Sequence, residues 1–375
     1  MNKLGIYVHV PFCVQKCRYC DFYSLPERDI ARYSDYKDAL QRHFEYMSDK
    51  ASEYTVDSVY FGGGTPSLLP SDVLSELLVS IRSHYNVSDD CEITLEMNPG
   101  TADHEAMKSY LKSGFNRLSI GCQSANDSEL HMLGRIHTFA DFCKTVEDAR
   151  RAGFENISAD LMMALPEQNR ESLISSIDKI AKTNPNHISV YGLKIEKGTW
   201  FDLHKDELLL PDEDAECELY LETVSQLEKR GYFQYEISNF SQNGYESRHN
   251  LKYWRSMPYI GFGPAAYSFI DNMRYGYRRD LKGYLEASKT SDYGSLMQDQ
   301  ECLTPQDCIE EKLLLGLRLR EGICINEFPF DVSVGDYIKM LCAKDMAELV
   351  GGRLHLTPKG MLVNNLIISE MLLHL

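Results

Sequence analysis

The segment PFCVQKCRYCDF, residues 11–22, carries three cysteines in the spacing CxxxCxxC. It directly follows a strand-like run, GIYVHV, at residues 5–10. Three thiolates on one short loop can ligate three irons of a [4Fe–4S] cube and leave the fourth iron open to an exchangeable small molecule. The alternative is that the three cysteines bind zinc. A zinc site would need a fourth Cys or His ligand at the spacing of a zinc finger, and none follows closely in the sequence. We therefore predict that Cys13, Cys17 and Cys20 hold a [4Fe–4S] cluster.

From residue 5 to about residue 240, short β-branched runs alternate with amphipathic stretches of helical length. The strand-like runs cover residues 5–10, 58–63, 92–99, 116–123, 157–166 and 187–195. The helix-like stretches cover residues 33–49, 71–85, 103–113, 139–152, 170–183 and 212–230. Six strand–helix units in succession predict an α/β fold with a parallel sheet and helices outside it. A seventh strand-like run, YFQYEISNF, covers residues 232–240.

Unusual polar and glycine residues fall where these strands end. Residues 62–65, Glu96, Gln123 and Asp160 lie at or just beyond the C-terminal end of a strand, as does the cysteine loop. In a barrel those ends form one mouth, so these residues would converge on one site. Six units are fewer than the eight of a closed barrel. We therefore predict an open, partial (β/α)6 barrel of the TIM type.

The C-terminal part of the chain has a different pattern. Residues 241–294 are less regular, whereas Thr304–Pro305 and Thr357–Pro358 each indicate a helix N-cap followed by proline in the first turn. GGRLHLT, residues 351–357, is typical of a tight hairpin. We predict three regions. They are a partial barrel (1–240), a connecting segment (241–294) and a smaller helical, winged-helix-like domain (295–375).

Net charge, the lengths of apolar runs and the number of cysteines limit the classes of protein to which this chain can belong. A net charge of −17 argues against a nucleic-acid partner, because phosphate binding needs a basic face. The sequence has no run of 18 apolar residues and no signal-peptide pattern, so we expect a cytoplasmic chain without a membrane span. Eleven cysteines in such a chain are not expected to form a disulfide framework. Eight are interpreted as buried small apolar residues: Cys91, Cys122, Cys143, Cys217, Cys302, Cys308, Cys324 and Cys342.

Several of the strand-end residues suit a polar ligand. The glycines of GGGTPS, residues 62–67, let a backbone approach a ligand and expose its amide groups. Glu96 could accept a hydrogen bond from an ammonium or a ribose hydroxyl. Arg135 offers a planar donor fork that suits a carboxylate. Each of these residues could also be structural, and their shared position at one mouth favours a site.

The motifs together resemble the radical S-adenosylmethionine (SAM) superfamily and, within it, the oxygen-independent coproporphyrinogen oxidase family. The resemblance rests on the cysteine loop with GGGTPS, LEMNPG, SIGCQS, LGRIH and DLMMALPEQ, and it covers nearly the whole chain. It implies a reduced cluster that can cleave SAM to methionine and a 5′-deoxyadenosyl radical, with an electron donor such as a flavodoxin-type reductant. The residues that it implies in SAM contact are Tyr7, Tyr19, Gly63, Gly64, Thr65, Glu96, Gln123, Arg135 and Asp160.

One position departs from the oxidase pattern. Coproporphyrinogen oxidases continue the motif to CxxxCxxCxC, whereas Phe22 stands at the last position here. Phenylalanine can neither ligate iron nor relay a thiol proton, which argues against decarboxylation. The sister branch of heme chaperones, HemW, carries CxxxCxxCxF and an HNxxYW motif. This chain has HNLKYW at residues 249–254, followed by GFGPAAYS at residues 261–268.

The HNxxYW segment has chemistry that suits a porphyrin. His249 could be an axial ligand of heme iron, and Tyr253 and Trp254 supply flat apolar area, with Asn250 completing the motif. A buried, hydrogen-bonded histidine among packed aromatic residues is an equal alternative from the residues alone. Nearby arginines could pair with heme propionates: Arg248, Arg255 and Arg274.

The resemblance favours a chaperone that carries heme and a SAM-ligated cluster and delivers the heme to acceptor proteins. It is also compatible with a homodimer. The alternative is SAM-dependent oxidative decarboxylation of coproporphyrinogen III to protoporphyrinogen IX.

Overall fold

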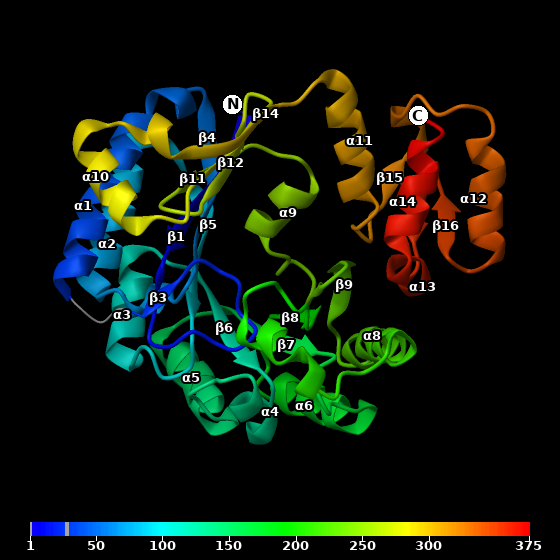
Figure 1. Ribbon diagram of the computed structural model, residues 1–375, viewed down its shortest axis with the longest axis horizontal. Helices are drawn as coiled ribbons and strands as arrows, with labels where there is room; N and C mark the ends of the chain where they lie inside the picture. The colour runs from blue at the N-terminus through cyan, green and yellow to red at the C-terminus, as the bar shows by residue number, and fades with distance from the viewer. Residues whose placement is uncertain (1, 27–29) are drawn as a thin grey trace.

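A computed structural model describes residues 2–26 and 30–375 (Figure 1). Six neighbouring parallel strands form the middle of its large sheet, and all six lie where the sequence predicts them. Their residues are mostly buried, as expected for a parallel sheet that is covered on both faces. In sheet order they are β1 (Asn2–Val10), β4 (Tyr54–Gly63), β5 (Val87–Met97), β6 (Arg117–Gln123), β7 (Asn156–Met163) and β8 (His187–Gly192).

The predicted helices connect these strands and lie on the outside of the curved sheet (Figure 1). Their starts follow local capping chemistry. Asn169 accepts a hydrogen bond from the Ser172 amide and forms a capping box, whereas Ser71 is the first helical residue after Pro70 and makes no side-chain cap. The helices are α1 (Ile30–Met47), α2 (Ser71–His84), α3 (His104–Ser113), α5 (Phe139–Ala152), α6 (Arg170–Lys182) and α8 (Glu213–Glu228).

The sheet continues beyond β1 with strands from the segment that the sequence marks as irregular. Strand β11 (Tyr259–Phe262) pairs with β1 in parallel, and antiparallel strands β12 (Tyr267–Ile270), β13 (Met273–Tyr277) and β14 (Met297–Cys302) follow. In the part of the chain that the structure describes, the strand order ends at β14 on one side and at β9 on the other. The fold is therefore an open, partial barrel. The division at residues 240 and 294 stays a prediction.

The seventh strand-like run forms a hairpin, not a seventh parallel strand. Its halves are β9 (Phe233–Glu236) and β10 (Asn239–Ser241), and β10 pairs with β8 in antiparallel fashion. Two residues join the halves, and a connection this short can only reverse the chain. The turn is fixed by the Glu236 carboxylate, which accepts a hydrogen bond from the Ser238 amide at 3.2 Å.

The C-terminal part forms a separate group of helices around a three-stranded sheet (Figure 1, orange to red). Thr304 and Thr357 cap the helices as predicted, and β16 and β17 form the predicted hairpin. Glu236 at the end of β9 pairs with Leu319, which joins this domain to the barrel. Its elements are α11 (Pro305–Gly316), β15 (Ile323–Cys324), α12 (Val334–Ala343), β16 (Ala347–Val350), β17 (Arg353–Leu356), α13 (Pro358–Leu362) and α14 (Asn364–Leu372).

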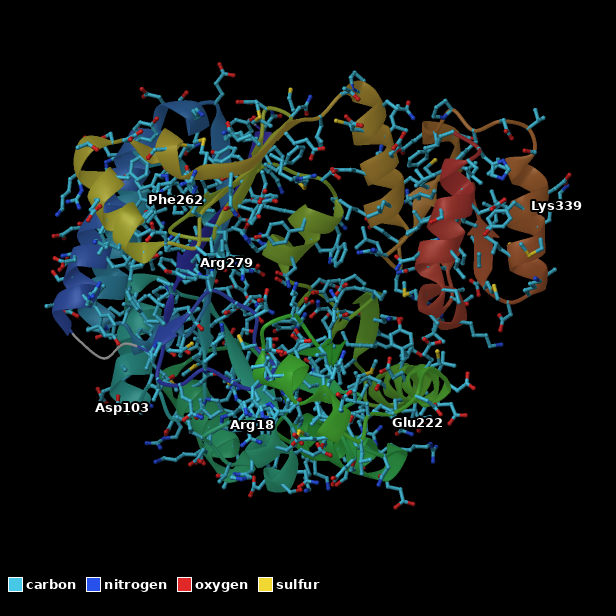
Figure 2. The ribbon with its side chains drawn as sticks, viewed as in Figure 1. Arg18, Asp103, Glu222, Phe262, Arg279 and Lys339 are labelled. Carbon is cyan, nitrogen blue, oxygen red and sulfur yellow. The ribbon has the colours of Figure 1, made fainter. Side chains whose placement is uncertain are left out.

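Short elements complete the chain. They are β2 (Phe12–Cys13), β3 (Leu25–Pro26), α4 (Asp127–Met132), α7 (Trp200–Leu203), α9 (Arg248–Trp254) and α10 (Leu281–Thr290). Charged residues such as Glu222 and Lys339 lie on the periphery (Figure 2). Within the described residues, none of the helices is long and apolar enough to cross a membrane.

The eight remaining cysteines only partly match the prediction of buried apolar residues. Cys91 and Cys122 are buried, but Cys302 is exposed because it ends the edge strand β14. The other five are half-buried: Cys143, Cys217, Cys308, Cys324 and Cys342. Sequence gives no signal for edge position, so Cys302 could not be distinguished from the buried cysteines.

Candidate functional site

The three cysteines of the first loop line one cavity of about 530 Å³ at the C-terminal ends of the parallel strands. We call it the cysteine cavity. Convergence of the strand ends, which the sequence predicts, is therefore confirmed for most of the candidate residues. Seven of the nine candidates for SAM contact line this cavity: Tyr19, Gly63, Gly64, Glu96, Gln123, Arg135 and Asp160.

The thiols have polar neighbours. The Cys13 thiol lies 3.5 Å from the Thr65 hydroxyl, and Arg135 donates a hydrogen bond from Nη1 to the Cys17 sulfur at 3.4 Å. Burial raises the pKa of the Cys20 thiol to about 11, so a thiolate here needs a positive partner such as a metal centre. In the described ranges, no three His, Cys, Asp or Glu side chains are arranged to hold a single metal ion.

Three half-buried thiols on one loop, with hydrogen-bond donors beside two of the sulfurs, fit a cube in which each thiolate binds its own iron. When bound, such a cluster supplies a single electron at its open iron. Cys13, Cys17 and Cys20 would hold it, while Thr65 and Arg135 would direct hydrogen-bond donors at its sulfurs.

The glycine-rich loop differs from the sequence interpretation. The amide of Gly63 donates to the Glu96 carboxylate at 3.1 Å. The amides of Gly64 and Thr65 donate to the carbonyls of Val10 and Phe12 at 2.8 and 2.7 Å. These amides are therefore already used by the protein, because β4 continues its pairing with β1 up to Gly63. Glycine is required at position 64, where a Cβ would lie 2.6 Å from the Phe12 carbonyl oxygen.

Glu96 is the acceptor at the centre of the cavity wall. Its Oε1 accepts from the Tyr60 hydroxyl at 2.7 Å and its Oε2 from Gly63. Burial, with a smaller contribution from the nearby Asp160, raises the pKa of this carboxyl to about 7. Glu96 therefore titrates in the physiological range and can present a full negative charge to a cationic ligand group.

Asp160 and Arg117 are two further polar residues on the wall. The Asp160 carboxylate accepts from the Ser119 hydroxyl at 3.2 Å, and burial raises its pKa to about 6. Arg117 also lines the cavity and is buried, and its Nε has no hydrogen-bond partner among the described residues. A buried polar atom of this kind fits a site that receives a polar ligand.

Arg135 is held by protein groups on several sides. Besides Cys17, it donates from Nη2 to the Asn98 side chain at 2.5 Å and to the Gly121 carbonyl at 2.8 Å. Its donor fork, which the sequence assigns to a ligand carboxylate, is thus directed at the cysteine loop. Asn98 in turn donates to the Thr65 hydroxyl at 2.9 Å, so it connects Arg135 with the residue beside Cys13.

We expect Arg135→Gln to lower the reduction potential of the reconstituted cluster, because a hydrogen bond and a positive charge near a sulfur stabilise the reduced state. An anaerobic redox titration followed by electron paramagnetic resonance measures the shift. Arg18→Gln is the control, since Arg18 lies on the cysteine loop itself but donates to the Met132 carbonyl and lies over Trp200. An unchanged or higher potential in the Arg135 variant would contradict this role.

Several residues of the cavity were missed by the sequence interpretation. A signal existed for Tyr60, which shares a strand face with Ser58 and Gly62, and for Asn98, which follows Glu96 directly beyond the strand end. Tyr191, whose hydroxyl donates to the Gln123 side chain at 2.7 Å, shows no such signal. Four missed lining residues form hydrogen bonds with predicted ones, namely Tyr60, Asn98, Ser119 and Tyr191, and Arg117 also lines the cavity.

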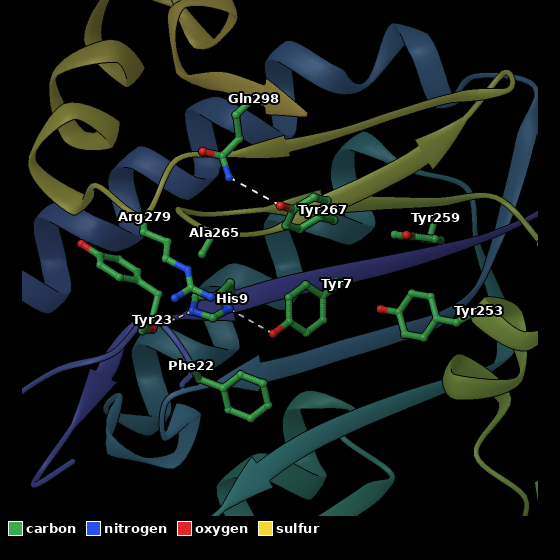
Figure 3. A pocket seen from close by; sticks show the side chains of 10 residues that line it. All are labelled: Tyr7, His9, Phe22, Tyr23, Tyr253, Tyr259, Ala265, Tyr267, Arg279 and Gln298. Carbon is green, nitrogen blue, oxygen red and sulfur yellow. Dashed lines mark hydrogen bonds between the residues drawn. The ribbon is translucent and has the colours of Figure 1, made fainter. Parts of the chain in front are cut away.

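Two of the nine candidates lie behind or beside the cysteine cavity. Thr65 is buried beneath it, bonded to Cys13 and Asn98. Tyr7 lines a neighbouring cavity of about 290 Å³, which we call the tyrosine cavity (Figure 3). Phe22 lines both cavities and is 64% exposed.

His249 is an interior residue with both ring nitrogens in hydrogen bonds. Nδ1 lies 3.0 Å from the Ser58 hydroxyl, Nε2 lies 2.9 Å from the Tyr253 hydroxyl, and the side chain is buried. Burial lowers its pKa to about 3, so the ring is neutral. Axial ligation by His249 would require breaking one of these bonds and moving the ring to a surface.

The other three residues of the motif point to three different places. Asn250 lines the cysteine cavity, Tyr253 lines the tyrosine cavity, and Trp254 faces the C-terminal domain, where the Arg318 guanidinium lies 5.8 Å from its ring. A seven-residue helix, α9, projects side chains on all sides, so the structure does not bring these four candidates together.

The arginines considered for propionates are each paired with an acidic residue. Arg248 contacts Asp90, Arg255 contacts Glu321, and Arg274 contacts Glu301 and Glu311. Arg279 also has a partner, Asp21 of the cysteine loop, at 3.0 Å, and it lines the tyrosine cavity.

Comparison with known proteins agrees with this architecture. A model of the Radical SAM superfamily matches residues 7–180, and a model of the HemN C-terminal domain matches residues 303–363. A radical SAM domain implies SAM and a [4Fe–4S] cluster. The structure is similar to coproporphyrinogen III oxidase (HemN) from Escherichia coli, a radical SAM enzyme, with a TM-score of 0.84 at 23% identity, over 100% of this chain and 91% of that one. At this identity the likeness concerns the fold.

Curated relatives named heme chaperone HemW match along the chain. The protein of Bacillus subtilis is 34% identical over 98% of this chain and 98% of its own length. That of Lactococcus lactis is 32% identical, over 98% and 97%, and that of Escherichia coli is 37% identical, over 72% and 71%. With its cysteine loop at the mouth of an open barrel and these relatives over nearly its whole length, the chain belongs to the HemW family of radical SAM proteins.

Proposed function

We propose that this protein is a cytoplasmic heme chaperone that binds heme beside a SAM-ligated [4Fe–4S] cluster and transfers the heme to acceptor proteins. The curated relatives carry that name over nearly the full chain, which supports the proposal. Reduced thiols are expected in the cytoplasm, and all eleven cysteines are free.

The observation that carries the proposal is the presence of an exposed phenylalanine at position 22. It stands where oxidases of this fold class carry a fourth cysteine, and its exposed ring faces both the cysteine cavity and the tyrosine cavity. A thiol at this place could take part in chemistry on a substrate, whereas a phenyl ring offers only apolar contact. An exposed aromatic ring beside the cluster loop suits the binding of a flat apolar molecule without its conversion.

The cysteine cavity suits the amino acid and ribose parts of SAM. It combines four carboxyl groups with two guanidinium groups and several hydroxyls, which match an ammonium, a carboxylate and a diol. We assign the ammonium or a ribose hydroxyl to Glu96. We assign the remaining hydroxyls to Asp160, and the Nε of Arg117 is a donor with no hydrogen-bond partner among the described residues.

We expect SAM affinity to rise as the pH increases through about 7, the pKa of Glu96. Below this value the carboxyl is protonated, and the ionised fraction falls about tenfold per pH unit. Asp160, with a pKa of about 6, adds a second loss at lower pH. Equilibrium dialysis of SAM against the reconstituted protein between pH 5.5 and 8.5 measures this. The Glu96→Gln variant should bind weakly and lose the step near pH 7, and an identical step in that variant would contradict the assignment.

The proposal is tested with one anaerobic sample. The reconstituted protein is titrated with hemin by absorbance and then incubated with coproporphyrinogen III, SAM and a reductant, and products are separated by chromatography. We expect saturable hemin binding near one per chain and no vinyl products at a catalytic rate. Catalytic formation of protoporphyrinogen IX would instead establish the alternative function, that of the oxidase.

A further inference from the structure

The tyrosine cavity is unusual in its chemistry. Of the ten described residues that line it, seven carry an aromatic ring. Burial lowers the pKa of His9 to about 4, so its ring is neutral, and Arg279 brings the positive charge of the lining. Flat apolar walls with a guanidinium at one end are complementary to a flat apolar molecule that carries a carboxylate.

We propose, on the basis of the proposed function, that the tyrosine cavity is the seat of the porphyrin. The macrocycle lies between Phe22 and Tyr267, and one propionate pairs with Arg279. Figure 3 shows Phe22 and Tyr267 on opposite sides of the cavity in this view, with Arg279 toward one end and Tyr253 toward the other. His249 then acts through Tyr253, whose hydroxyl it holds, and is a positioning residue.

Backbone features of β12 and β13 and of the segment before β12 shape one wall of the cavity. Tyr267 is paired with Gly276 in the sheet, and a Cβ at Gly276 would lie 2.7 Å from the tyrosine ring. The ring therefore lies flat on β13, and its hydroxyl donates to Asp299 at 2.6 Å. Ala265, also in the lining, has a φ of 67°, a strained conformation for a residue with a Cβ. The segment GFGPAAYS thus forms one side of the site.

The size of the cavity favours a partly inserted ligand. About 290 Å³ lies at the small end of the range for ligand pockets, so a porphyrin would be held by one side and remain partly in solvent. The two residues on either side are exposed, Phe22 by 64% and Tyr267 by 40%, and would cover part of the remainder. Such a seat is open to an acceptor protein, which suits delivery.

Asp21 competes with the propionate for Arg279. The Asp21 carboxylate lies 3.0 Å from Nη2 of Arg279 and belongs to the cysteine loop directly after Cys20. A propionate that takes Arg279 must displace Asp21 at least in part. Substitutions at the two partners of this ion pair should therefore change hemin affinity in opposite directions, which a merely structural ion pair would not do.

The experiment is a hemin titration of the reconstituted protein and its variants, followed by Soret absorbance. We expect Phe22→Ala and Arg279→Gln each to weaken hemin binding about tenfold, and Asp21→Asn to tighten it. With hemin dimethyl ester, whose carboxyl groups are capped, wild type and Arg279→Gln should bind equally.

The matched controls are Phe233→Ala and Arg255→Gln. Phe233 is an exposed phenylalanine on the distant strand β9, and Arg255 is an arginine in a surface ion pair outside the cavity. Both should bind hemin like wild type. Equal hemin binding by wild type, Phe22→Ala and Arg279→Gln would overturn the seat while leaving the chaperone proposal intact. Loss of binding on substitution of Arg255 would also overturn it. A wild-type protein that does not bind hemin would overturn both proposals.

Discussion

Replacing Cys17 by serine is expected to abolish the cluster, with iron after reconstitution falling from about four per chain to near zero. A serine hydroxyl is a poor iron ligand, and two thiolates on the loop cannot hold a cube that needs three. The broad absorbance of the cluster should vanish with the iron. Cys13→Ser and Cys20→Ser should have the same effect, because the three residues line one cavity and share one function.

The fold should survive this substitution. The three cysteines are half-buried on a loop whose backbone is held independently of the thiols, for example by the Arg18 amide on the Leu133 carbonyl at 3.0 Å. Far-ultraviolet circular dichroism of Cys17→Ser should therefore match wild type. Cys302→Ser is the control, since Cys302 is exposed on β14. A cluster retained in Cys17→Ser, or lost equally in Cys302→Ser, would contradict the ligand assignment.

The second large effect concerns Lys252, within the HNxxYW motif. Its ammonium lies 2.5 Å from the Asp57 carboxylate, and both side chains are nearly buried. Its carbon chain packs on Gly5, where a Cβ would lie 2.9 Å from Cδ. We expect Lys252→Met to reduce the free energy of unfolding by about 3–5 kcal/mol, because the substitution leaves a buried carboxylate without its partner. Urea unfolding followed by fluorescence measures the change.

The double variant Lys252→Met, Asp57→Leu should recover much of this loss, since no buried charge then remains unpaired. Lys359→Met is the matched control. Lys359 and Asp345 form an ion pair at 2.7 Å in which both side chains are exposed, and such pairs contribute about 0–1 kcal/mol. A loss in Lys252→Met no larger than in Lys359→Met would show that the motif does not anchor α9.

Many strands and helices of the barrel and of the C-terminal domain could be predicted because local pattern decides them. Alternating apolar runs, helix caps such as Asn169 and Thr304, and the hairpin glycines at 351 and 352 each depend on neighbours within a few residues. The interpretation of the seventh strand-like run as a single strand was wrong, because a two-residue turn inside this run reverses the chain. Nothing in its alternation marks that turn.

Only those residues of the candidate site that lie at the ends of predicted strands could be predicted from the sequence. Position at the mouth identified Glu96 and Asp160, but the partners of each side chain depend on distant segments. The ring of His249 is held by Ser58, which lies 191 residues earlier in the chain. Motif chemistry alone could not reveal that this histidine is an interior residue. It could not place Tyr7 in a neighbouring cavity either, because both facts depend on which strand faces which helix.

Delivery of heme tests the central claim most directly. The reconstituted protein is loaded with one equivalent of hemin, freed of excess, and mixed anaerobically with the heme-free form of an acceptor heme protein, and the Soret band of the acceptor is followed. We expect this transfer to go to completion. The Phe22→Ala and Arg279→Gln variants should bind less hemin and therefore deliver less of it. Hemin that stays on the protein, while coproporphyrinogen III is converted catalytically to vinyl products by the same preparation, would contradict the central claim.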